Sequence, residues 1–148
     1  MTSALAHAPA EIVAQMIIDL AKGTDPGDSL AWPVYVDFAP ESPDQLIAVD
    51  TSESIDGGKC QTGEVTELHG IHVLVRSNTY SAGQVKARDI AVTLDEQVQN
   101  KQVTYSGSDY IVSSFRRRGG VLNPTRLDKD SRRNVFTFHG TVTIREVT

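Results

Sequence analysis

A strict alternation of apolar and polar side chains between residues 134 and 147 restricts the fold more than any other feature of the sequence. Successive side chains of a strand point to opposite faces, so one face of this segment is apolar and the other polar. The apolar positions are Phe136, Phe138, Val142 and Ile144, with Gly140 in register, and the polar positions are Thr137, His139, Thr141, Thr143 and Arg145. One buried and one hydrated face is typical of an antiparallel sheet.

Other segments carry weaker strand patterns. In the longest, Val65–Ser77, alternate residues from Ile71 to Val75 share one face, and Gly70 favours a bulge. The shorter ones are Val34–Phe38, Leu46–Asp50, Lys101–Tyr105, Tyr110–Arg117 and Val121–Leu127. The Ser-, Gly- and acid-rich segment 51–64 predicts a long loop, and residues 1–8 are expected to be flexible.

Two segments have helical periodicity. The first spans residues 9–22, where Pro9 opens the segment and Gly23 follows as a stop. The second lies within Tyr80–Gln99, with Ser77 or Asn78 as a cap. The predicted order is α-β-β-β-α-β-β-β, in which the last group has three or four strands. We expect a single α+β domain over 1–148, with both helices packed on one face of a mainly antiparallel sheet.

Charge is distributed unevenly along the 148 residues, whose net charge is −5. Residues 1–100 hold five basic and fifteen acidic residues, whereas residues 101–148 hold nine basic and four acidic ones. The total excludes a generally basic nucleic-acid binder, and the split predicts a molecule with two unlike faces.

Several classes of protein are disfavoured. The single cysteine, Cys60, allows neither an intramolecular disulfide framework nor a cysteine zinc cluster. No apolar stretch approaches the roughly 18 residues that span a bilayer, and residues 1–10 do not read as a secretory signal. We therefore expect an intracellular protein without a membrane contact.

The sequence carries no motif of an active site. His69 and His72 are three apart on a strand, which places them on opposite faces and argues against a shared metal. Cys60 beside Lys59 and the carboxylate pairs Asp50/Glu53 and Asp95/Glu96 lack the partners that catalysis needs. We expect no catalytic residue, no cofactor and no metal.

The triplet Arg116, Arg117 and Arg118 is the sharpest local feature. On a strand, the first and third arginine point one way and the second the other. The triplet suits a subunit interface, a hydrated hairpin end or, less well, phosphate binding together with Arg126, Arg132 and Arg133.

Two stretches of the chain have a distinctive layout. One is the strand Glu67–Ser77 followed at once by a helix opening at Tyr80. The other is the Arg-rich strand with Gly119-Gly120, a polar hairpin and the alternating strand from Arg133 to Gly140. This layout resembles the tail-terminator, or minor capsid, proteins of long-tailed (siphovirus-type) bacteriophages. The resemblance covers residues 9–146, although the Pro-rich segment 24–43 and segment 51–64 depart from the family pattern.

The resemblance implies a structural virion protein of the tail and neck, assembled in the host cytoplasm. Such a protein forms a homo-oligomeric ring, typically a hexamer, that caps the tail tube, ends its polymerisation and joins tail to head. Its partners would be further copies, the tail tube protein and a head-completion or connector protein, with DNA only as cargo in the lumen. The expected interface residues are Arg116, Arg117, Arg118, Arg132, Arg133, Asp50, Glu53 and Asp56.

Three other functions stay open at this point. The first is a head-closure or connector protein of the same neck region. A nucleic-acid-binding module would use the basic last third, and a small enzyme would use Cys60 or the histidine pair.

Overall fold

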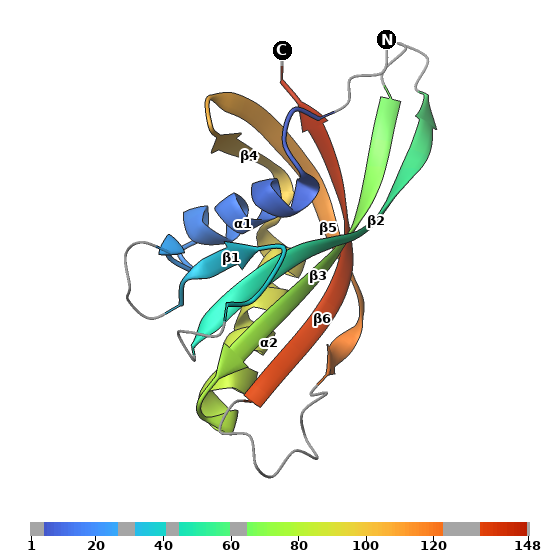
Figure 1. The fold of residues 1–148 in the computed structure, drawn as a ribbon. Coiled ribbons are helices and arrows are strands. Elements are labelled where there is room, and N and C mark those ends of the chain that lie inside the picture. Colours follow the sequence, from blue (N-terminus) through green and yellow to red (C-terminus); the bar gives the residue numbers. More distant parts are fainter. Residues whose placement is uncertain (1–4, 27–31, 41–44, 60–64, 123–133, 148) are drawn as a thin grey trace.

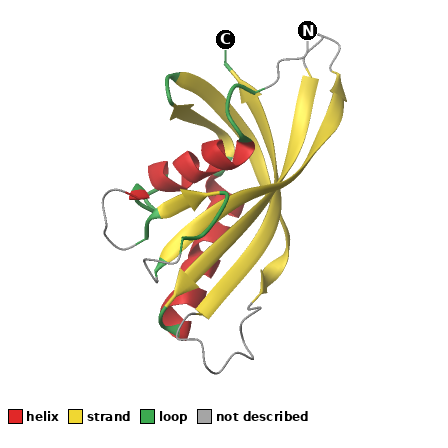
Figure 2. Ribbon diagram, viewed as in Figure 1, coloured by secondary structure: helices red, strands yellow, loops and turns green. Residues whose placement is uncertain are grey.

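The computed structural model describes residues 5–26, 32–40, 45–59, 65–122 and 134–147; for residues 53–59 and 65–67 it describes the backbone only. Within these described ranges, two helices and six strands follow one another. Figures 1 and 2 show their arrangement. In chain order they are α1 (Pro9–Asp19), β1 (Val34–Val36), β2 (Leu46–Lys59), β3 (Val65–Ser77), α2 (Tyr80–Gln97), β4 (Gln99–Tyr105), β5 (Ser108–Leu122) and β6 (Asn134–Glu146).

The six strands form one sheet in the order β1-β2-β3-β6-β5-β4. Neighbouring strands are antiparallel except for β1 and β2, which run parallel. The prediction of an α+β protein with a mainly antiparallel sheet is therefore confirmed. The two strands with the clearest alternation, β3 and β6, lie next to each other at the centre of the sheet.

The buried face of the sheet follows the predicted alternation. Ile71, Val73 and Val75 of β3 are fully buried, and β6 presents the apolar side chains between Phe136 and Ile144 to the same core. Side chains from both helices and all six strands join this single cluster. A central strand is paired on both sides, so its two faces differ only in whether they are buried. The alternation of its side chains therefore follows burial closely.

The helices cover the buried face in a way that the sequence does not predict. Both lie on the same side of the sheet in Figure 1. Helix α2 packs along β3, β6 and β5, but α1 lies across the curled sheet and contacts β1 and β2 near one edge as well as β4 at the other. The expected packing on one face thus differs from the structure in detail, because α2 runs along the central strands whereas α1 reaches strands near both edges.

Helix α1 is held by the stripe that its sequence predicts. Ile12, Val13, Met16 and Ile17 are all inaccessible to solvent. Burial of each such side chain contributes about 1.5–3 kcal/mol relative to exposure. This apolar stripe is what stabilises α1 in the hollow of the curled sheet.

The end of α1 differs from the expected glycine stop. The helix ends at Asp19, and Ala21, not Gly23, adopts the left-handed conformation, with φ of 60°. The N–H of Ala21 donates to the carbonyl of Ile18 at 2.9 Å, and the N–H of Lys22 donates to that of Ile17 at 3.1 Å. This pair of hydrogen bonds is the Schellman arrangement, which satisfies the last carbonyls of the helix.

The long loop predicted over residues 51–64 is largely a strand. Strand β2 continues to Lys59 and pairs with β3 as far as Val65; residues 60–64 lie outside the described part of the chain. The bulge that Gly70 favoured is present, but its extra residue is Ser52 on the partner strand β2. The polar composition of this segment resembles a loop, yet pairing with β3 keeps it extended.

The two strands predicted over 110–117 and 121–127 are one strand, β5, as far as Leu122. Strand β4 joins it through a two-residue turn in which Ser106 and Gly107 have φ of 49° and 84°. Positive φ at both central positions is the type I′ geometry that suits the twist of a hairpin. No helix in the described residues is long and apolar enough to cross a membrane.

Gly140 allows the aromatic packing between β5 and β6. A Cβ atom at Gly140 would overlap the ring of Phe115, which is buried on the core side of the sheet. By contrast, a Cβ at Gly120 meets nothing within 4 Å.

We therefore expect Gly140→Ala to lower the free energy of unfolding by about 1–3 kcal/mol, because the ring must move within a packed core. Gly120→Ala is the matched control and should change it by less than about 0.5 kcal/mol. Urea unfolding of the two variants measures the difference. Equal stability of both variants would contradict the close contact between residue 140 and the ring.

Candidate interface surface

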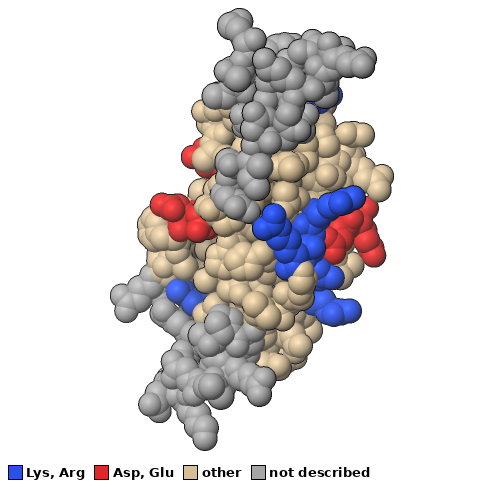
Figure 3. Space-filling model, turned by 90° about the vertical axis from the view of Figure 1, so that its right-hand side faces the viewer, with Lys and Arg blue, Asp and Glu red and all other residues tan. Residues whose placement is uncertain are grey.

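The second face of the sheet is covered by neither helix (Figure 2). The polar residues of β6 and β5, such as His139, Thr141 and Arg116, lie on this face. Figure 3 looks onto this side of the molecule and shows Lys and Arg side chains near its middle, with Asp and Glu side chains to either side. We call it the open face. Its residues alternate with the core residues along β3, β6 and β5, so the same pattern that builds the core also builds this surface.

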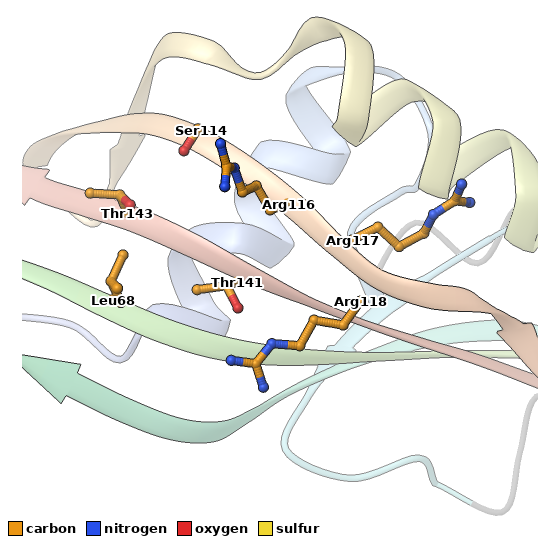
Figure 4. A pocket seen from close by; sticks show the side chains of 7 residues that line it. All are labelled: Leu68, Ser114, Arg116, Arg117, Arg118, Thr141 and Thr143. Carbon is orange, nitrogen blue, oxygen red and sulfur yellow. The ribbon is translucent and has the colours of Figure 1, made fainter. Parts of the chain in front are cut away.

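The three consecutive arginines of β5 divide between the two faces, as the alternation predicts. Arg117 points toward α2 (Figure 4), and its Nε lies 3.4 Å from Oδ2 of Asp95. Arg116 and Arg118 are exposed and border the open face. Only two of the three guanidinium groups are therefore presented on the open face.

A groove of about 550 Å³ lies beside these arginines on the open face (Figure 4). The polar groups along it come from neighbouring positions of β5 and β6: Thr141 is directly opposite Arg116, and Thr143 is directly opposite Ser114. Among the side chains that the structure describes, those that line it are Leu68, Ser114, Arg116, Arg117, Arg118, Thr141 and Thr143.

A row of four ionisable residues crosses the open face next to this groove. Asp50 of β2 is paired with His72 of β3, His72 with His139 of β6, and His139 with Arg118 of β5. The two imidazole rings are stacked, with centroids 4.5 Å apart and planes 17° apart. The row thus runs from an anion at one side of the sheet to a cation at the other.

The stacked arrangement disfavours a charge on His72. Partial burial lowers the pKa of its imidazole below the ordinary value of 6.5, nearby His139 lowers it further, and Asp50 opposes both effects. The unfolded chain therefore binds this proton more readily than the folded one. It follows that His72 makes the folded state less stable as the pH falls through 6.5 toward its own lower pKa.

The structure separates the histidines that the sequence considered as metal ligands. His69 is buried on the core side, whereas His72 lies on the open face, as the odd spacing predicts. Within the described residues no three His, Cys, Asp or Glu side chains gather in a way that could hold a metal ion. Cys60 lies outside the described part of the chain.

The predicted interface residues fall into four groups. Arg116, Arg118 and Asp50 occupy the open face, and Arg117 is turned toward α2. Glu53 and Asp56 lie on the extended part of β2, where only the backbone is described, and Arg132 and Arg133 lie outside the described residues.

The sequence reading missed the contribution of β6 to this surface. His139, Thr141 and Thr143 lie on the polar face of a strand that was identified, but that face was taken only as hydrated. Their strict alternation was the available signal. The alternation does not give the register between β5 and β6, which places Thr141 opposite Arg116.

Two long segments of strand form edges of the sheet among the described residues. Strand β1 pairs with β2 only between Ile47 and Val49, although β2 continues along β3 to Lys59. Strand β4 pairs with β5 only as far as Ser114, although β5 continues along β6 to Leu122. We call these segments, 50–59 and 115–122, the β2 edge and the β5 edge.

No family model matches the sequence, and no curated protein matches it. One solved structure is 15% identical, covers 95% of this chain and 98% of its own, and superposes with a TM-score of 0.47. Its name describes no activity, and a likeness at this level carries no argument about function.

The contacts of His72 predict opposite effects for two substitutions. His139→Gln removes a like charge and should raise the pKa of His72, whereas Asp50→Asn removes an attractive charge and should lower it further. A pH titration of the His72 ring resonances by nuclear magnetic resonance measures both. An unchanged pKa in both variants would contradict the row of contacts across β2, β3 and β6.

Proposed function

We propose that this chain is a structural subunit of a homo-oligomeric ring that ends a phage tail tube and joins it to the head. The observation that carries the proposal is the pair of sheet edges, which lie on opposite sides of the sheet and carry opposite charge. A closed ring needs two different surfaces on each subunit that fit one another. The β2 edge and the β5 edge are such a pair.

The direction of the strands suits this contact. Because β2, β3, β6 and β5 are successively antiparallel, β5 runs opposite to β2. When copies are placed side by side in the same orientation, a β5 edge that faces a β2 edge forms an antiparallel pair, and the parts of the two edges at the same level of the sheet are residues 50–54 and 115–118. Strand addition of this kind uses the main-chain groups that an edge presents.

Charge supports the same pairing. The β2 edge carries Asp50, Glu53 and Asp56 against one cation, Lys59, and is acidic overall. The β5 edge carries Arg116 and Arg118 with Arg117 between them. Opposite charges across an interface fix its register and disfavour pairing of like edges. A β2 edge is therefore expected to reject a second β2 edge and to accept a β5 edge.

The particular assembly comes from the resemblance to the tail-terminator family. In this proposal the ring is a hexamer located in the neck of the virion, its partners are the tail tube protein and a head-completion or connector protein, and the chain has no catalytic role. Binding to a portal-side ring instead of the tube would favour the related head-closure function.

Reversal of charge at one edge should prevent assembly, and mixing two reversed variants should restore it. We expect Arg116→Glu/Arg118→Glu alone and Glu53→Lys/Asp56→Lys alone to stay monomeric, because each has two edges of the same sign. Mixed together, each edge again faces its opposite. Arg117 is left unchanged in these variants because it pairs with Asp95. Sedimentation and electron microscopy, with and without tail tubes, measure whether rings form.

The matched control is Arg88→Glu/Arg145→Glu, which makes the same change of charge at two exposed positions outside both edges. This variant should assemble as the natural chain does. Circular dichroism checks that each variant is folded. If both edge variants assemble normally at low and high salt, the uneven charge serves solubility only and the proposed interface is wrong.

A further inference from the structure

The stacked histidines of the open face lie at the level of the sheet where the two proposed edges meet. His72 and His139 are paired between β3 and β6, with ring centroids 4.5 Å apart. The row that holds them ends in Asp50 on the β2 edge and in Arg118 on the β5 edge. When copies stand side by side, the row of one copy therefore continues into the row of the next.

Histidine is the side chain whose ordinary pKa puts its change of charge between pH 5 and pH 8. The pair thus makes the charge of the open face variable in this range. The histidines have two acidic positions of β2 on one side and two arginines of β5 on the other: Asp50, Glu53, Arg116 and Arg118. Neither helix lies over the pair (Figure 2), and the neighbouring positions of β3 and β6 on this face are uncharged.

Protonation of His72 changes the balance of charge at the β2 edge. It places a cation beside Asp50, which is the residue at the start of that edge. The edge then presents less negative charge to the arginine-bearing β5 edge of the next copy. Complementary charge across an interface is weakened in this way, so protonation opposes the contact.

The effect of pH on assembly follows from the same charges. In the single chain, burial and then nearby His139 lower the pKa of His72 below 6.5, and Asp50 opposes them. The arginines of a neighbouring copy bring further positive charge and lower this pKa again. The assembled state therefore binds fewer protons than the separate chains, and its stability is lost as the pH falls below 6.5.

We infer that the stacked pair His72 and His139 is a pH switch of assembly, so that rings form at neutral pH and separate in mildly acidic solution. The inference rests on the proposed ring, because it concerns the contact between the two strand edges. It adds a regulation that two complementary edges do not by themselves require.

Sedimentation of the full chain at pH 7.5, 6.0 and 5.0, at low and high salt, tests this inference. At low salt, the concentration at which half of the chains are assembled should rise about threefold or more between pH 7.5 and pH 5.0. The rise should shrink at high salt, because interactions between exposed charges are screened. The series stops at pH 5.0 because carboxylates in general take up protons below it.

Three variants assign the effect to the pair. His72→Gln/His139→Gln removes both titrating groups and should assemble equally at all three pH values. His72→Lys carries a permanent charge at the same place and should assemble more weakly even at pH 7.5. The matched control is His7→Gln, which removes a histidine that lies against Tyr110, outside the row, and should keep the pH dependence of the natural chain.

The outcomes separate the switch from the ring. Rings that form equally well at every pH, or a pH dependence that persists in the double glutamine variant, would overturn the switch and leave the ring standing. Loss of the folded circular dichroism signal together with assembly would assign the effect to unfolding and would also overturn the switch. Absence of rings at every pH and salt concentration would contradict both proposals.

Discussion

The packing of both helices against a single face of a curled sheet determines the rest of the structure. Because α1 lies across the hollow and reaches strands near both edges, it fixes the curl and closes the core that α2 covers over the central strands. One face is thereby given to apolar side chains and the other to polar ones. The open face, its groove and its row of charges are direct consequences of this one-sided burial.

The sequence predicts most of the helices and strands, because their side-chain patterns depend only on residues that are close together in the chain. The alternation in residues 65–77 gives the bounds of β3, and the helical stripe after Tyr80 gives α2 to within two residues. Where tertiary pairing overrides composition, the prediction fails. Residues 51–59 are polar and rich in glycine, yet their pairing with β3 makes them a strand.

The candidate site is predicted only in part for the same reason. The alternation correctly separates Arg117 from Arg116 and Arg118, because that is a property of neighbouring residues. The stacking of His72 on His139 depends on the register between strands that are far apart in the sequence. Single-strand patterns carry no information about that register, so neither the row across the sheet nor the groove could be derived.

The position of β6 has a consequence for how the chain folds. β6 lies between β3 and β5 and pairs Glu67 with Ile144, so the centre of the sheet joins segments separated by more than half of the sequence. Closing so large a loop is entropically costly and slows folding relative to a hairpin such as β4–β5. Before β6 docks, β3 and β5 both present long bare edges. The nascent chain is therefore most prone to aggregate in the interval between synthesis of β5 and insertion of β6.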